Sequence, residues 1–252
     1  TVIVENKPGA GGRSGTEYAK VQPADGTTML VVNPALFVVA PVVFSKLNYD
    51  PEADFAPVSL IQIYQFCASV PPSSPIKDVK GLIDWIKKNP NQANYGSPAA
   101  GSLPHFFGLM IGKAAGVEMV HSSYNGSGPL VTALIGNQIP IGVDAYDAQS
   151  AYHPDKIRIL ATAGAARKEE GFPEIEGVGW NAIVVPAKTP KPVIDKLSAA
   201  IVKAVKSPDV AEKIQGLGSD PAGTTPEECA AVFKKDRERW VPIIKASGFK
   251  AD

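Results

Sequence analysis

Strand-like runs alternate with helix-like segments along the whole chain, and this alternation limits the possible folds more than any other feature. Two examples are the strand-like run Ala93–Gly96 before the apolar helical segment Pro104–Ala115, and Glu118–Ser122 before Pro129–Ile135. Short loops join these segments. Such a pattern is typical of proteins in which helices cover both faces of a mostly parallel sheet. The sequence therefore predicts an α/β fold.

Capping residues and hydrophobic periodicity give the remaining elements. In Val79–Lys88 the apolar residues recur at helical spacing, and Thr225-Pro226-Glu227-Glu228 is a capping box that opens a helix reaching Ala246. The other expected strands are Thr1–Glu5, Thr27–Val32, Ile61–Val70, Ile139–Val143, Ile157–Thr162 and Ala182–Val185. The other expected helices are Thr16–Val21, Val193–Lys206 and Asp209–Gln215.

Length and charge narrow the class further. The 252 residues exceed the usual size of one domain, which favours two lobes. The 25 basic and 25 acidic side chains balance, whereas a nucleic-acid surface needs clustered excess lysine and arginine. No run is long and apolar enough to span a membrane, and no signal peptide is recognisable. The opening Thr1-Val2-Ile3-Val4 looks like a buried strand from the middle of a fold, which suggests that further sequence precedes it.

Catalytic and metal-binding patterns are absent from the sequence. Cys67 and Cys229 are the only cysteines, and we expect two unpaired structural thiols. The histidines His105, His121 and His153 have no metal-ligand spacing, and no serine lies in a nucleophile-elbow motif. We therefore expect no enzymatic activity, no metal and no cofactor.

Three loops that precede expected helices share small, flexible and hydroxyl-bearing residues. They are Pro8–Gly15, Gly96–Ser102 and Asn125–Gly128. In open α/β sheets ligands bind beyond the carboxyl ends of the strands, where helix N-termini present unpaired N–H groups and a partial positive charge. Such loops bind carboxylate or phosphate without lysine or arginine. Helix capping alone explains any one loop, but three together favour an anion site.

A dinucleotide fingerprint is the main rival interpretation of the first loop. The run Gly9-Ala10-Gly11-Gly12-Arg13-Ser14-Gly15 follows an expected strand and precedes a helix. However, the motif G-x-G-x-x-G would need glycine where Ser14 stands, and no acidic residue ends the next strand. The spacing therefore argues against a nucleotide cofactor.

Several short motifs follow one another along the chain. They are Val4–Gly12, Pro23–Thr27, Tyr49–Val58, Asn94–Ser97 with Gly101, Ser102 and His105, Tyr124–Ser127, Val185–Pro190 and Thr225–Glu228. Each motif is weak alone, but together they cover essentially the whole chain. In this order they resemble the motifs of the Bug family, the extracytoplasmic receptors of tripartite tricarboxylate transporters.

The resemblance implies a periplasmic-binding-protein fold of the Venus-flytrap type, with two α/β lobes joined by crossing strands. The crossings are expected near Phe66–Val70 and Ile183–Pro186, so that residues 1–67 and 187–252 form lobe 1 and residues 68–186 form lobe 2. The implied function is capture of a small carboxylate (an amino-acid dicarboxylate, a tricarboxylate or an aromatic acid) by lobe closure. A periplasmic monomer would then deliver the ligand to the membrane permease subunits.

In this family the second-lobe loop carries much of the recognition, and the resemblance places it at Ser97, Ala100, Gly101 and Ser102. The other candidate ligand-binding residues lie at ends of expected strands or in the loops that follow them. They are Asn33, Tyr124, Ser127 and Asp144. For Asp144 and Asp147 we expect hydrogen bonds from loop N–H groups, because an ionised buried acid would repel an anionic ligand.

Two departures from the family pattern affect the expected site. Family members have another strand, a glycine-rich loop and a helix before the position of Thr1, and that loop normally forms the first-lobe half of the site. The segment Glu169–Trp180 is shorter than usual, and Ala145 stands where asparagine often follows the aspartate. Trp180 and Asn33–Phe37 are therefore candidates for shaping an individual ligand preference, although Phe37 is better explained by core packing.

Two alternatives to transport remain open from the sequence. The first is a nucleotide-dependent or acyl-transfer enzyme that uses the Gly9–Gly15 loop. The second is a receptor that passes its signal to a sensor kinase rather than to a permease, which the residues alone do not separate from transport.

Overall fold

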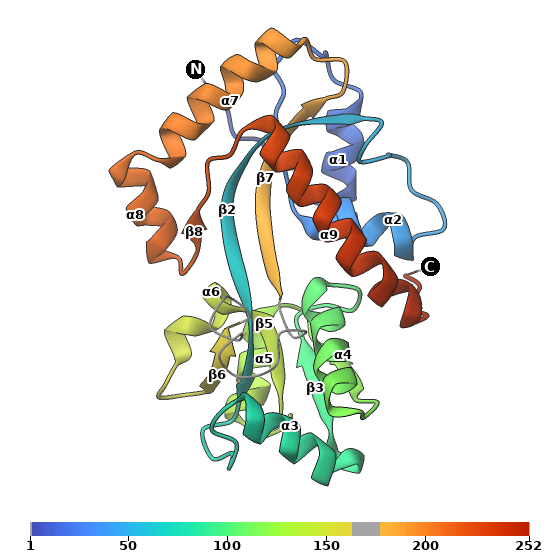
Figure 1. Cartoon of the computed structure of the whole chain (residues 1–252), viewed down its shortest axis with the longest axis vertical. Coiled ribbons are helices and arrows are strands. Elements are labelled where there is room, and N and C mark those ends of the chain that lie inside the picture. Colours follow the sequence, from blue (N-terminus) through green and yellow to red (C-terminus); the bar gives the residue numbers. More distant parts are fainter. Residues whose placement is uncertain (1, 163–176, 252) are drawn as a thin grey trace. The chain divides into compact units, whose positions relative to one another are not determined.

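The computed structural model describes residues 2–162 and 177–251. The chain divides into two compact units (Figure 1). Unit 1 comprises residues 1–63, 180–216 and 220–252, and unit 2 comprises residues 64–179 and 217–219. The divisions fall inside two long strands, β2 (Phe55–Val70) and β7 (Val178–Pro186). The expected divisions, after residue 67 and before residue 187, fall within β2 and directly after β7.

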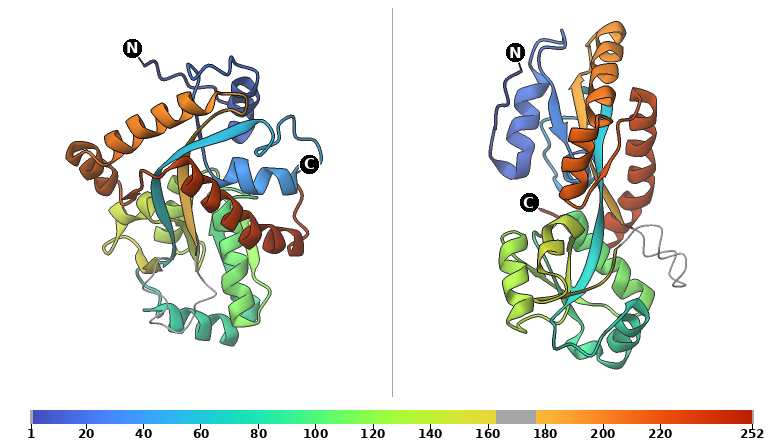
Figure 2. Two further views of the ribbon diagram at one scale, coloured as in Figure 1. Left: turned by 45° about the horizontal axis from the view of Figure 1, so that its top comes forward. Right: turned by 90° about the vertical axis from the view of Figure 1, so that its left-hand side faces the viewer.

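Unit 1 contains part of β2, part of β7 and two short strands. Its helices come from the beginning and the end of the chain. Strand β1 pairs with β7, and β8 pairs with β2, both antiparallel. Helices α1 and α9 lie on opposite sides of these strands (Figure 2, right). The elements are α1 (Arg13–Lys20), β1 (Leu30–Val32), a π-helix (Ala35–Val39), α2 (Ala40–Val43), α7 (Lys191–Val205), α8 (Pro208–Gly216), β8 (Asp220–Pro221) and α9 (Pro226–Ala246).

Aromatic rings and one buried hydrogen bond organise the core of unit 1. Trp180 on β7 is 1% exposed, stacks on Phe233 of α9 with 4.5 Å between ring centroids, and donates its indole N–H to Asp236 at 2.7 Å. Phe37 packs against the same Phe233. Trp180 therefore belongs to the core of unit 1. Asp236 inside α9 supplies the acceptor that a buried indole N–H needs.

Unit 2 holds the only parallel strand pairs in the described residues. Strand β3 (Asn94–Ser97) runs parallel to β4 and to β5, and β2 pairs antiparallel with β5 and β6. Helices α3 and α4 cover one face of this sheet, and α5 with α6 covers the other (Figure 2, right). The other elements are α3 (Val79–Lys88), α4 (Leu103–Ala115), β4 (Val120–Ser123), α5 (Ser127–Ile135), β5 (Gly142–Ala145), α6 (Tyr146–Gln149) and β6 (Arg158–Thr162).

Local chemistry explains where the helices of unit 2 begin and end. Asp78 caps α3 by accepting the Gly81 N–H at 2.6 Å, and Ser102 caps α4 by accepting the His105 N–H at 3.4 Å. Helix α4 ends at Gly116, whose φ of 67° is the left-handed conformation common at helix ends. Fully buried side chains from both helices, among them Ile83, Ile86, Phe106 and Phe107, form the core on this face.

Three expectations about the strands are corrected. The sheet is mixed rather than mostly parallel, because the long strands β2 and β7 introduce antiparallel neighbours. Residues 2–5 form no strand; Val2, Ile3 and Val4 are at least 80% exposed, and nothing in the described residues pairs with them. Strand β2 begins at Phe55, six residues before the expected start at Ile61.

Two helical segments were not among the expected helices, and α7 begins without a side-chain cap. The run Ala35–Val43 is helical throughout, although its valines and phenylalanine favour a strand. Helix α6 follows β5 directly. The N-cap of α7 is Pro190, and the Thr189 hydroxyl donates to the Pro186 carbonyl at 2.7 Å instead of capping the helix. The capping box of α9 is confirmed, and Cys67 and Cys229 are not joined by a disulfide.

Candidate functional site

The carboxyl ends of three neighbouring strands in unit 2 bring most of the candidate residues to one edge of the sheet. The parallel register sets Ser97 of β3 beside Ser123 of β4, and Gly96 beside Gly142 of β5. The loops after these strands lead into α4, α5 and α6. Seven of the eight candidate ligand-binding residues lie here, namely Ser97, Ala100, Gly101, Ser102, Tyr124, Ser127 and Asp144.

The loop from Ser97 to Ser102 closes around a single carbonyl. The Ala99 carbonyl oxygen accepts the Ser97 hydroxyl at 3.1 Å, the Ser102 hydroxyl at 2.7 Å and the Ser102 N–H at 3.3 Å. Ser97 is fully buried, whereas Ser102 is half-buried. The buried Ser97 hydroxyl therefore supports the loop, whereas the half-buried Ser102 hydroxyl could donate to a ligand only by giving up its bond to the Ala99 carbonyl.

Two backbone donors of this loop already have acceptors. The Ala100 N–H donates to the Ser123 hydroxyl at 2.9 Å, and the Gly101 N–H donates to His105 Nδ1 at 3.1 Å. Gly101 has a φ of +73°, which glycine adopts without strain. A carboxylate at this end of α4 would therefore meet the Ser102 hydroxyl and the Leu103 N–H of the first turn, since first-turn N–H groups have no acceptor within the helix.

Two stacked histidines lie beneath the loop. The rings of His105 and His121 are 3.9 Å apart at their centroids with an interplanar angle of 17°, and His121 Nε2 lies 2.8 Å from Ser97 Oγ. Burial, and then the neighbouring His121, lowers the pKa of His105 to about 4, and burial also lowers the pKa of His121. Both rings are therefore neutral at pH 7.

The neighbouring loop, between β4 and α5, is tied to the first. The Tyr124 N–H donates to the Ser97 carbonyl at 2.9 Å, and the Gly126 N–H donates to the Pro98 carbonyl at 2.9 Å. The Tyr124 ring packs so closely on Gly96 that a Cβ there would lie 2.7 Å from it. Tyr124 therefore stabilises the two loops chiefly through its backbone and its packing on β3.

Asp144 at the end of β5 is a buried acid beside the start of α5. One carboxyl oxygen accepts the Ala145 N–H at 2.7 Å, and the other has no partner among the described residues. Burial raises the pKa of this carboxyl to about 6, against the opposing effects of the Ser127 hydroxyl and the Ala145 N–H. Asp144 is 2% exposed, so in this structure it acts on the loops rather than on a bound molecule.

Replacing Asp144 with asparagine should raise the midpoint of thermal unfolding at pH 8, raise it about half as much at pH 5, and change it little below the unfolded pKa of 3.8. The raised pKa means that the folded protein holds this proton more tightly than the unfolded chain. The resulting stability is present below the unfolded value of 3.8 and is lost as the pH rises through about 6. A shift of this size corresponds to on the order of 3 kcal/mol.

Differential scanning fluorimetry from about pH 3.5 to pH 8 covers both pKa values and measures this effect. Asparagine keeps the acceptor for the Ala145 N–H, and Asp84→Asn on the exposed face of α3 serves as the control. A difference between the Asp144 variant and the original protein that stays constant across this range would contradict the assignment.

The remaining candidates lie in unit 1. Asn33 follows β1, and its side-chain oxygen accepts the Leu36 N–H at 3.3 Å at the start of the next helical run. The last three residues of the Pro8–Gly15 segment already belong to α1, and no strand precedes the segment among the described residues. It is therefore not the strand-to-helix turn that the sequence predicted.

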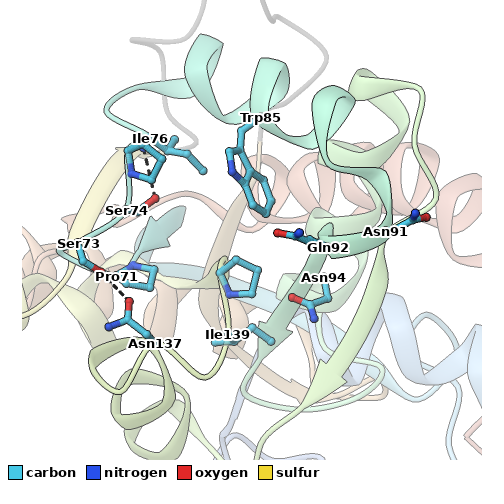
Figure 3. A pocket seen from close by; sticks show the side chains of 12 residues that line it. Pro71, Ser73, Ser74, Ile76, Trp85, Asn91, Gln92, Asn94, Asn137 and Ile139 are labelled. Atoms are coloured by element: carbon cyan, nitrogen blue, oxygen red, sulfur yellow. Dashed lines mark hydrogen bonds between the residues drawn. The ribbon is translucent and has the colours of Figure 1, made fainter.

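A cavity of 510 Å³ lies at the other end of the sheet in unit 2 (Figure 3). It is bordered by Asn94 at the start of β3, by Ile139 before β5 and by Trp85 of α3. The described residues that line it include no charged side chain; they come from the segment after β2, from α3, and from the residues at and before the amino ends of β3 and β5. It is therefore separate from the helix starts where the candidate residues gather.

The described residues contain no cluster of histidine, cysteine, aspartate and glutamate that could hold a metal ion. In the same part of the chain, every helix is too short or too polar to cross a bilayer.

The fold of the two units is that of periplasmic binding proteins. The solved periplasmic binding protein BugD is similar with a TM-score of 0.80 and 27% identity, covering 99% of this chain and 88% of that one. The R. palustris protein Rpa4515, solved with adipate, is similar with a TM-score of 0.85 and 26% identity, covering 98% of this chain and 87% of that one.

Sequence comparison gives the family. The sequence model of the protein family described as the tripartite tricarboxylate transporter family receptor matches residues 1–249. A UPF0065 protein from the tcbD-tcbE intergenic region of Pseudomonas sp. strain P51 is 30% identical, over 96% of this chain and 76% of its own length. The chain therefore belongs to the tripartite tricarboxylate transporter receptor family, whose members are periplasmic receptors rather than enzymes. This finding overturns the nucleotide-dependent enzyme as an alternative.

Two residues of the loop network were missed from the sequence. His121 contacts Ser97, and Ser123 accepts the Ala100 N–H, but neither was chosen as a candidate. A usable signal was present, because residues at the carboxyl ends of adjacent parallel strands share one edge of the sheet.

Proposed function

We propose that this protein captures a small carboxylate at the start of α4 and delivers it to the permease subunits of a tripartite transporter. The observation that carries the proposal is the Ser97–Ser102 loop, which sets a rotatable hydroxyl and a helix N-terminus at the carboxyl end of β3. The partial positive charge of the helix end favours an anion. The adipate bound to the related Rpa4515 supports a dicarboxylate as the first ligand to try.

The uncharged side chains around the Ser97–Ser102 loop suit a receptor that must bind a carboxylate and then release it. The two histidines under the loop are uncharged at pH 7, so the site attracts a carboxylate through dipoles and hydroxyls rather than through a formal charge. Release to a permease is easier from such a site than from a buried ion pair, because no charge is left unpaired. Closure of the two units over the ligand, as a monomer in the periplasm, completes the proposed cycle.

A thermal-shift screen tests the proposal. Adipate and other aliphatic dicarboxylates, tricarboxylates and aromatic acids are compared with neutral counterparts such as adipamide. At 100 times its dissociation constant, a ligand that binds only the folded protein adds about 2.7 kcal/mol of stability. That gain corresponds to a rise of roughly 5–10 °C in the unfolding midpoint of a protein of this size.

The charge of the ligand decides the outcome. A rise with at least one acid and none with its neutral counterpart supports the proposal. A rise with neutral compounds alone, or with no acid of the three classes, contradicts it.

A further inference from the structure

We infer that His105 and His121 are positioning residues, which hold the backbone of the Ser97–Ser102 loop in the form that receives a carboxylate. The inference rests on the function proposed above and adds two residues that do not themselves touch the ligand. Its basis is the pair of hydrogen bonds that the two imidazoles make to the loop, one as acceptor and one as donor.

His105 acts as the acceptor. Its Nδ1 receives the Gly101 N–H at 3.1 Å, so Nδ1 carries no proton and the neutral ring is protonated at Nε2. The His105 backbone is held as well, since the Tyr95 hydroxyl donates to the His105 carbonyl at 2.7 Å. The hydrogen bond from the Gly101 N–H to Nδ1 fixes the peptide of Gly101, the loop residue with the greatest conformational freedom.

His121 acts as the donor. The one hydroxyl proton of Ser97 is given to the Ala99 carbonyl at 3.1 Å, which leaves Ser97 Oγ to accept a proton from His121 Nε2 at 2.8 Å. The Ala99 carbonyl is also the acceptor for Ser102. The imidazole of His121 is thus linked to the Ser102 hydroxyl through the Ser97 hydroxyl and the Ala99 carbonyl.

The stacked arrangement disfavours a positive charge on both rings at once. With centroids 3.9 Å apart, two imidazolium ions would repel each other strongly. Tyr95 also packs against His121, with centroids 5.0 Å apart, and Phe106 stacks on His105 at 4.9 Å. A hydrocarbon side chain could fill much of this space but could make neither hydrogen bond, which separates a positioning role from mere packing.

Matched pairs of variants make the test. His105→Asn keeps an acceptor near the position of Nδ1, and His105→Leu removes it. His121→Gln keeps a donor near the position of Nε2, and His121→Met removes it. The two substitutes at each position have similar size. A loss of affinity common to both therefore reports packing, and a difference in affinity between them reports the hydrogen bond.

Isothermal titration calorimetry with the carboxylate selected by the thermal-shift screen gives the first readout. Because a hydrogen bond lost to a buried group typically corresponds to about a tenfold change in an equilibrium constant, we expect His105→Leu and His121→Met to bind roughly tenfold or more weakly. The Asn and Gln variants should stay within about threefold of the original protein. Equal affinities within each pair would overturn the inference.

A second readout needs no ligand and separates failure of this inference from failure of the proposed function. In ¹⁵N–¹H spectra of the intact protein, the Gly101 amide should shift and lose exchange protection in His105→Leu but not in His105→Asn. If that difference appears while no carboxylate binds, the positioning role stands and the proposed ligand class fails. An unchanged Gly101 amide in His105→Leu would overturn the positioning role whatever the binding result.

Discussion

Replacing Gly108 with alanine should lower the midpoint of thermal unfolding more than any other single-methyl change in unit 2. An alanine Cβ at this position would overlap three carbons of the Tyr95 ring. The ring is fully buried, and its hydroxyl is fixed to the His105 carbonyl at 2.7 Å, so it has no room to withdraw. Overpacking of this kind costs about 3 kcal/mol or more, which corresponds to a fall of roughly 6–12 °C.

Scanning calorimetry measures this change, with Gly128→Ala as the matched control. Position 128 lies in the first turn of α5, and a Cβ there meets nothing within 4 Å. We expect the control to melt at the same temperature as the original protein or slightly above it, since alanine favours a helix more than glycine does. If both variants melt alike, Tyr95 is less rigidly held than its contacts indicate.

Helices with clear caps could be predicted almost to the residue. Val79–Lys88 was predicted in full, and Pro104–Ala115 was predicted within one residue at its start, because polar caps and proline or glycine mark their ends. The capping box at Thr225 placed the start of α9 in the same way. For these elements local chemistry decides the structure, and a single sequence carries that information.

Elements decided by tertiary contacts could not be predicted from the sequence. Strand β2 runs from Phe55 to Val70 because it continues from one unit into the other, which no local pattern reveals. The segment Ala35–Val43 has strand-forming residues, but it is helical where it packs against α9. Residues 2–5 show the opposite error, since a good strand pattern forms no strand without a partner.

In the candidate site, too, local chemistry could be predicted from the sequence and contacts between elements could not. Small and hydroxyl-bearing residues before a helix predict where an anion can bind, and the structure does gather the loops after β3 and β4 at one edge of the sheet. The sequence does not reveal which donors are already used. That Ala100 and Gly101 give their N–H groups to Ser123 and His105 depends on contacts between separate elements. Ser102 stands out only in the structure, because its hydroxyl is half-buried and can exchange the Ala99 carbonyl for a ligand.

Replacing Ser102 with aspartate should abolish carboxylate binding while leaving the protein folded. Aspartate caps a helix as well as serine does, so α4 should keep its N-terminus, although the donor to the Ala99 carbonyl is lost. Two like charges about 4 Å apart at an effective dielectric constant near 20 repel by about 4 kcal/mol. We therefore expect at least a ~100-fold weaker affinity, given that about 1.4 kcal/mol is a factor of ten.

Ser102→Asn separates charge from shape in this experiment, because its amide is neutral, has the same shape as the aspartate carboxyl and can donate to the Ala99 carbonyl. Calorimetric titration with the acid found by thermal shift should give an affinity for the asparagine variant within about tenfold of the original, since at most one hydrogen bond is altered. Both variants should unfold within a few degrees of each other. Equal binding by the aspartate and asparagine variants would mean that the carboxylate is held elsewhere, because a negative charge at the start of α4 would then repel nothing.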